Sequence, residues 1–152
     1  MKTGNIKKVL IALDYDESSQ KVAETGFLLA QTMNAETVLL HVIYENPAYY
    51  SSNMYMLEWN VNIMSDLKSS TREFLDKIKK QLGNETIKTV VKEGIIADTI
   101  LETAKKLNAD IIVMGSHSRK WLENIILGSE AQDVLKDTTI PLYIVPTRKH
   151  IE

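Results

Sequence analysis

Short apolar runs of strand length alternate along this chain with stretches of helical period, and this alternation restricts the fold more than any other feature. Most runs are nearly continuous in apolar side chains, which is typical of parallel strands covered on both faces. The expected strands are Val9–Leu13, Thr37–Ile43, Thr86–Lys92, Asp110–Met114 and Leu142–Val145. Because Thr86–Lys92 alternates with polar residues, we expect it nearer a sheet edge. The pattern predicts an α/β fold, a single doubly wound domain whose five-stranded, mostly parallel sheet carries helices on both faces.

Length and composition are those of one globular domain. A chain of 152 residues predicts a single domain, residues 1–152, with its core over about residues 7–147. Eighteen basic residues against 20 acidic ones leave a net charge of −2, which provides no basic field for nucleic acid. The absence of cysteine excludes disulfides and thiolate metal sites. No apolar stretch approaches the roughly 18 residues of a membrane span, and no signal peptide is recognisable, so we expect a soluble cytoplasmic protein.

Glycine and serine follow the fourth expected strand, where an anion can be held. In doubly wound sheets, ligands bind beyond the carboxyl ends of the strands. Gly115 and Gly128 allow backbone N–H groups to approach a phosphate closely. Ser129 has Gln132 three residues on, which is capping-box spacing, so we expect Ser129 to open a helix whose N-terminus favours negative charge. On these residues alone, phosphate binding and a purely structural role as strand end and helix cap both stay open.

After the fourth expected strand, Met114-Gly115-Ser116-His117-Ser118 is followed by nine residues and then by Gly128-Ser129. Over Lys8 to Val145 the chain resembles the universal stress protein family. That family's ATP-binding members carry G-x-x-G, nine residues, then G-[S/T], after a strand that typically ends in Met-Gly. Asp14 matches the acidic end of the family's first strand, and Leu40-His41-Val42 matches its second. The resemblance implies a Rossmann-like sheet of order 3-2-1-4-5, like that of the adenine-nucleotide alpha hydrolases.

The same resemblance implies an adenine nucleotide as ligand: ATP, or ADP or AMP in its place, accompanied by Mg²⁺. Asp14, with Ala12 beside it, would contact the ribose or adenine, and Val42 would offer backbone groups to the adenine edge. The phosphates would be surrounded by residues of the loop and of the following helix, namely Met114, Gly115, Ser116, His117, Ser118, Arg119, Gly128, Ser129 and Glu130.

Two positions depart from the family pattern. Ser118 stands where the second glycine is expected, so the backbone there is less free to adopt a positive φ. Glu130 places a carboxylate where ATP-binding relatives often have a small apolar residue. Its charge beside a triphosphate is unfavourable unless a divalent cation or Arg119 offsets it.

Catalytic motifs are absent from the sequence. It has no G-x-S-x-G nucleophile elbow and no P-loop lysine, so we expect slow ATP hydrolysis at most. A receiver domain is disfavoured because Thr86–Lys92 leads into Glu93-Gly94 and not into a phosphorylatable aspartate. Two functions stay open: a nucleotide-dependent stress regulator, and a nucleotide-free dimeric module of the same family that works through partners the sequence does not name.

Two segments suggest contacts with other chains. Leu142–Val145 is apolar with an open edge, and in the resembled family the last strand often pairs in a dimer, so we expect a homodimer through it. Glu45–Asp66 is rich in Tyr and Met and contains no Lys or Arg. We expect a loop packed on the domain that leads into a helix, with a mobile flap or a partner-binding surface as the alternatives.

Overall fold

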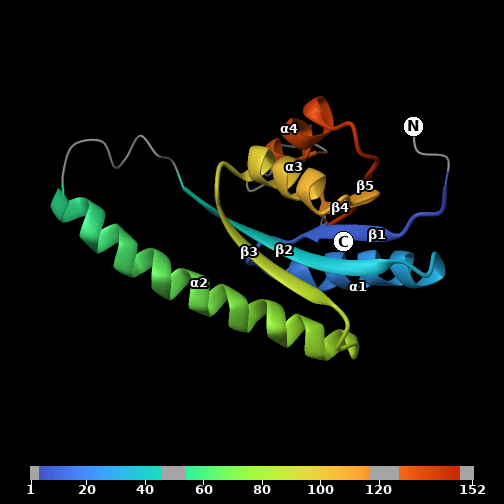
Figure 1. Cartoon of the computed structure of the whole chain (residues 1–152), viewed down its shortest axis with the longest axis horizontal. Coiled ribbons are helices and arrows are strands. Elements are labelled where there is room, and N and C mark those ends of the chain that lie inside the picture. The colour runs from blue at the N-terminus through green and yellow to red at the C-terminus, as the bar shows by residue number, and fades with distance from the viewer. Residues whose placement is uncertain (1–3, 46–53, 117–126, 148–152) are drawn as a thin grey trace, which may run out of the picture.

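The computed structural model describes residues 4–45, 54–116 and 127–147, and in the first turns of its long second helix it describes side chains only from residue 62 onward. Nine elements follow one another in these ranges (Figure 1): β1 (Lys8–Ala12), α1 (Ser19–Thr32), β2 (Glu36–Tyr44), α2 (Met54–Leu82), β3 (Lys88–Gly94), α3 (Ile96–Lys106), β4 (Ile111–Gly115), α4 (Ser129–Asp137) and β5 (Leu142–Val145). The strands form one parallel sheet of order β3-β2-β1-β4-β5, which confirms the expected fold and the edge position of β3.

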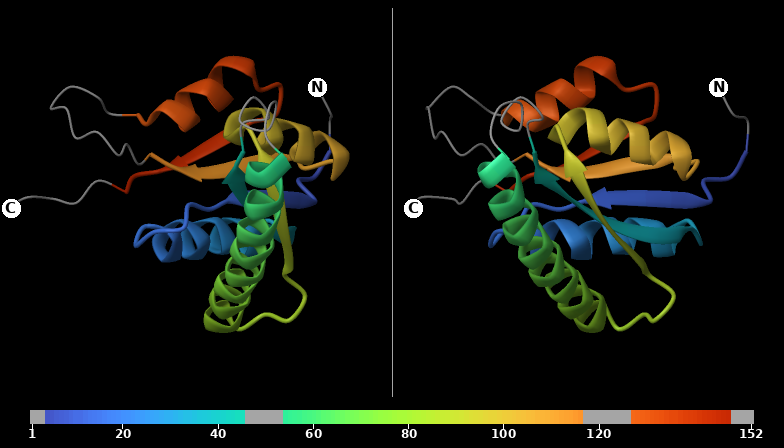
Figure 2. Two further views of the ribbon diagram at one scale, coloured as in Figure 1. Left: turned by 90° about the vertical axis from the view of Figure 1, so that its left-hand side faces the viewer. Right: turned by 60° about the vertical axis from the view of Figure 1, so that its left-hand side comes forward.

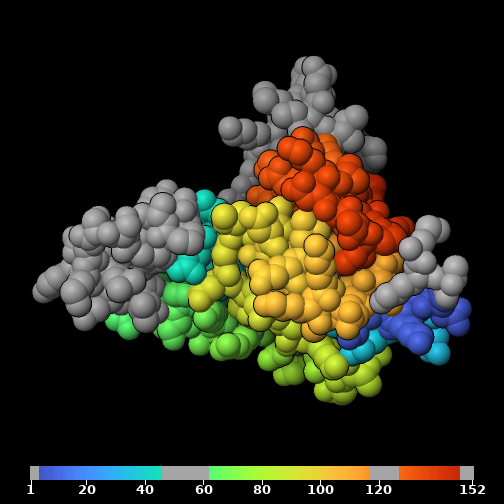
Figure 3. All heavy atoms as spheres, turned by 45° about the horizontal axis from the view of Figure 1, so that its top comes forward, coloured from blue at the N-terminus to red at the C-terminus, as the bar shows by residue number. Residues whose placement is uncertain are grey.

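The sheet separates two apolar cores. Helices α1 and α2 cover one face, and α3 and α4 cover the other (Figure 2). In the space-filling view of Figure 3, α3 and α4 lie towards the viewer. Because successive side chains of a strand point to opposite faces, Ile11 and Leu39 join the α1/α2 core, whereas Leu10 and Leu40 join the α3/α4 core. All four side chains are fully buried. The buried residues of the inner strands β1, β2 and β4 therefore join one core or the other, which is why these runs appear continuously apolar.

Helix α1 approaches the sheet most closely at Gly26. A Cβ atom added there would lie 2.6 Å from Cδ1 of Ile11 and 3.2 Å from Cγ1 of Val113. These distances leave no room for a side chain between α1 and the two central strands. Close packing therefore explains why this position is glycine, although glycine weakens a helix interior.

Helix α2 corrects one expectation. Residues 54–66 belong to this 29-residue helix, so the expected loop is wrong there; residues 46–53 lie outside the described ranges. At 1.5 Å per residue the helix is about 43 Å long, whereas the longest strand, β2, spans about 30 Å. Buried Thr71, Leu75 and Ile78 hold its second half against the sheet, and its first half extends beyond the sheet (Figures 1 and 2). No helix in the described ranges is long and apolar enough to cross a membrane.

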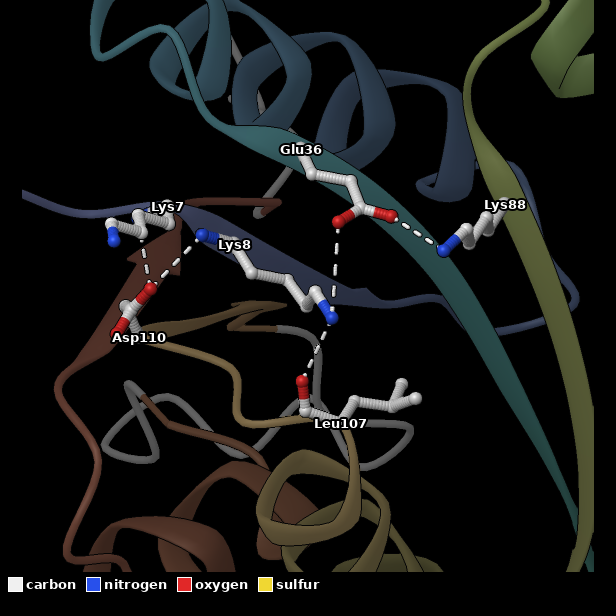
Figure 4. A network of polar contacts seen from close by, with 6 residues as sticks. All are labelled: Lys7, Lys8, Glu36, Lys88, Leu107 and Asp110. Carbon is white, nitrogen blue, oxygen red and sulfur yellow. Dashed lines mark hydrogen bonds and ion pairs between the residues drawn. The ribbon is translucent and has the colours of Figure 1, made fainter.

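A polar network closes the amino end of the sheet (Figure 4). One carboxylate oxygen of Asp110 accepts hydrogen bonds from the backbone N–H groups of Lys7 and Lys8, at 2.9 and 3.0 Å. The ammonium group of Lys8 donates to the carbonyl of Leu107 at 2.9 Å, which joins β1 to the end of α3. These contacts fix the start of β1 against the segment that enters β4.

Glu36 makes part of the stability pH-dependent. The hydrogen bond from Lys88, at 2.8 Å, and the charge of Lys8, at 3.8 Å, hold the pKa of Glu36 below its ordinary value. A lowered pKa in the folded state stabilises the protein at pH above the unfolded-state pKa, and this contribution is lost as pH falls through the folded-state value. Because the pair is partly exposed, we expect Glu36→Gln to lower the free energy of unfolding at pH 7 by less than about 1 kcal/mol. Urea titrations should show this difference shrinking towards pH 3, and a difference independent of pH would contradict the assignment.

Candidate functional site

Two adjoining hollows form a groove at the carboxyl end of the sheet. The smaller has a volume of about 20 Å³ and the larger about 520 Å³. Asp14, Val42, Ile96 and Glu130 line both, so we treat the two as one carboxyl-end groove. The larger volume falls in the range of roughly 300–1,000 Å³ that is typical of small-molecule sites.

The smaller hollow lies on the α3/α4 face. Ala12, Leu40 and Met114 come from three neighbouring strands, and Ile96 and Ile100 from α3. Gly94 makes this arrangement possible, because its φ of +148° turns the chain out of β3 directly into α3. A Cβ atom at Gly94 would lie 2.5 Å from the hydroxyl oxygen of Thr99, so glycine is required there by both conformation and space.

The larger hollow extends towards α2. The β1–α1 turn contributes Asp14 and Tyr15, β2 contributes His41 to Tyr44, and α2 contributes Leu67, Ser70 and Thr71. The backbone N–H of Leu13 donates to the carbonyl of Leu40 at 2.8 Å, so pairing continues one residue beyond β1 and places exposed Asp14 at the mouth of the groove. The groove therefore passes from one face of the sheet, around the strand ends, to the other face.

Ser116 connects β4, β5 and α4. Its backbone N–H donates to the carbonyl of Val145 at 2.9 Å, and its carbonyl accepts from the N–H of Gly128 at 3.1 Å. Its hydroxyl oxygen accepts from the backbone N–H of Thr147 at 3.0 Å. In this arrangement Ser116 holds the start of α4 beside the end of β4, where the resemblance implies phosphates.

Helix α4 begins without a side-chain cap. Gly128 is its N-cap, and the first helical hydrogen bond runs from the N–H of Gln132 to the carbonyl of Gly128, at 3.0 Å. The N–H groups of residues 129–131 therefore have no acceptor within the helix. The expected capping box is wrong: the hydroxyl of Ser129 donates to Glu130 at 3.2 Å, and the side chain of Gln132 donates to the carbonyl of Leu127 at 2.6 Å.

The charges at the groove are negative in the described ranges. Asp14 and Glu130 line it, and no lysine or arginine among the described residues does. In that part of the chain, no group of three or more histidine, aspartate or glutamate side chains is placed to hold a metal ion. Phosphate charge would therefore be met by backbone N–H groups, by a cation that the ligand brings, or by Arg119, which lies outside the described residues.

The structure brings half of the expected site residues together. Six of the twelve line the groove, namely Ala12, Asp14, Val42, Met114, Gly115 and Glu130. Ser116, Gly128 and Ser129 lie directly beside it, at the junction of β4 with α4. His117, Ser118 and Arg119 fall outside the described residues.

The other lining residues were not among the site residues predicted from the sequence. They are Leu13, Tyr15, Leu40, His41, Ile43, Tyr44, Leu67, Ser70, Thr71, Ile96, Ile100 and Ala131. Ile96 could have been found, since it follows the carboxyl end of β3 much as Asp14 follows β1. The residues of α2 carry no comparable signal, because only the packing of that helix brings them to the groove.

Comparison with known proteins finds the same fold in solved structures and assigns the chain to a family. The family model of the universal stress protein family matches residues 5–146. The chain belongs to the universal stress protein family. It is similar to universal stress protein MJ0531 of Methanocaldococcus jannaschii, with 32% identity over 145 residues, which cover 94% of this chain and 84% of that protein.

Solved structures of family members superpose over nearly the whole chain. The structure of protein MJ0577 has a TM-score of 0.80 and 26% identity, and the match covers 97% of this chain and 100% of the other. A universal stress protein in complex with cAMP has a TM-score of 0.65 and 20% identity, covering 93% and 98%. At that identity the second likeness establishes the fold alone.

Proposed function

We propose that this universal stress protein binds an adenine nucleotide, with ATP as its main ligand, in the carboxyl-end groove. The observation that carries the proposal is the junction of a large hollow with an uncapped helix start. The 520 Å³ hollow has room for a nucleoside, and the N–H groups at the start of α4 suit an anion. The complex of a family member with cAMP supports the same ligand class.

Each part of the nucleotide has a proposed position. Backbone groups of Val42 would meet the adenine edge, and the carboxylate of Asp14 would accept hydrogen bonds from ribose hydroxyls. The phosphates would lie along Gly115 and the start of α4, with His117, Ser118 and Arg119 near them. Mg²⁺ would offset the charge of Glu130 and keep most of its waters.

The bound nucleotide would act as a signal of state for partners in the stress response. The described lining offers no lysine to a transferring phosphate, so hydrolysis would be slow. A turnover of many per second by the purified protein, abolished by Asp14→Ala, would contradict this.

Isothermal titration with ATP, ADP and AMP, with and without Mg²⁺, tests the proposal. We expect ATP with Mg²⁺ to bind, and Ser118→Gly to bind it more tightly if the serine restricts the loop. Absence of binding by all three nucleotides at millimolar concentration would leave the alternative, a nucleotide-free dimeric interaction module. The observation that favours this alternative is Glu130, whose carboxylate lines the groove where phosphates would lie.

The proposed assembly is a homodimer through β5. This strand pairs with β4 on one side and is the last strand of the described sheet. Tyr143 is 43% exposed on it, and an open apolar edge associates readily with another strand. Multi-angle light scattering should give twice the monomer mass at micromolar concentration, and a monomer there would overturn the proposal.

A further inference from the structure

His41 holds the turn that carries Asp14. It lies in β2 opposite Val91 of β3, its side chain is half-buried, and it lines the larger hollow. Its Nδ1 atom lies 2.6 Å from the carbonyl oxygen of Leu13. Because a carbonyl only accepts, Nδ1 must carry the hydrogen, and it does so in both the neutral tautomer that this bond selects and the protonated ring.

The imidazole ring also contacts the residue on the other side of Asp14. The ring of Tyr15 meets it edge-on, with centroids 6.1 Å apart and planes at 67°. Tyr15 in turn lies against Phe74 of α2, with ring centroids 4.4 Å apart. One side chain of β2 therefore contacts both chain neighbours of Asp14, the first through its carbonyl and the second through its ring.

We infer that His41 is a positioning residue that fixes Asp14 for recognition of the ribose hydroxyls, an inference that rests on the proposed nucleotide function. One contact on each side of Asp14 restricts the rotation of the two peptide groups that adjoin this residue. Without the imidazole, the carbonyl of Leu13 loses its partner and the ring of Tyr15 loses its neighbour, so the turn can rotate. The carboxylate of Asp14 then no longer occupies one position at the mouth of the groove.

The test compares ATP with 2′,3′-dideoxy-ATP, which lacks the ribose hydroxyls that Asp14 would bind. In the wild-type protein we expect ATP to bind at least about hundredfold more tightly, since two hydrogen bonds to a carboxylate are involved. In His41→Leu, which keeps apolar bulk but donates no hydrogen bond, we expect the preference to fall below about twofold. Affinity for dideoxy-ATP should fall much less than affinity for ATP.

Two further variants separate positioning from packing. In His41→Asn the amide nitrogen takes the place of Nδ1, so we expect much of the preference for ATP to return. Tyr44→Leu alters another wall of the same hollow without touching the turn, and it should change both affinities by the same factor. Melting curves establish that each variant is folded.

The outcomes distinguish this inference from the proposal on which it rests. If His41→Leu weakens both nucleotides equally, or if His41→Asn restores no preference, His41 only lines the hollow, although nucleotide binding stands. If the wild-type protein binds both nucleotides equally, Asp14 does not bind the ribose hydroxyls and the inference is overturned. If it binds neither, the proposed function fails and the inference fails with it.

Discussion

In Gly128→Val, affinity for ATP is expected to fall by more than about hundredfold, which corresponds to the loss of two or more charge-assisted hydrogen bonds. Gly128 is buried at the start of α4, where its N–H bonds to the carbonyl of Ser116. Its φ of −65° suits valine, so the backbone itself is not strained. The obstacle is the branched side chain itself, added at the N-cap of α4 beside which the phosphates are proposed.

The control for this variant is a glycine with open space around it. Gly4→Val introduces the same side chain where nothing lies within 4 Å of a Cβ, and it should leave both binding and melting temperature unchanged. Gly128→Ala should give an intermediate loss, because a methyl group obstructs less than an isopropyl group. If folded Gly128→Val, verified by circular dichroism, binds ATP as well as the wild-type protein does, the phosphates do not lie at α4.

Gly26→Val should destabilise the protein by about 3 kcal/mol, because a branched side chain has to be placed between α1 and the sheet. The Cβ atom alone would lie 2.6 Å from Ile11. The higher helix propensity of valine compared with glycine offsets less than about 1 kcal/mol of this loss. Urea unfolding measures the change, and Leu28→Val, on the same helix at a residue that is 62% exposed, should cost well under 1 kcal/mol by comparison. A loss below about 1 kcal/mol for Gly26→Val would show that α1 can move away from the sheet.

Apolar runs located the strands well because burial on both faces demands them. Leu142–Val145 was predicted with its observed bounds, whereas the strand predicted at Thr86–Lys92 is observed at Lys88–Gly94. The difference has a local cause. The side-chain oxygen of Asn84 accepts hydrogen bonds from the backbone N–H and the hydroxyl of Thr86, at 2.8 and 2.6 Å, and holds that residue in a turn.

The first half of α2 could not be recognised by its period. An amphipathic pattern marks a helix where one side packs on a core, and this half extends beyond the sheet. The second half shows the pattern because Leu75 and Ile78 are buried.

The residues of the candidate site likewise fall into those that the sequence could predict and those that it could not. Residues at strand ends, such as Asp14 and Gly115, follow from topology, whereas Leu67 and Thr71 reach the groove only through the packing of α2.

The position of the groove across the two separate cores has a consequence for cooperativity. The cores described above have no residue in common, so we expect the helical layers on the two faces of the sheet to open locally as separate units. The groove contacts both layers, through Ile96 of α3 and through Leu67 of α2. A molecule seated in it must lose contacts whenever either layer opens. Occupancy would therefore couple the fluctuations of the two layers, and we expect amide hydrogen exchange in α2 and α3 to slow together when the groove is filled.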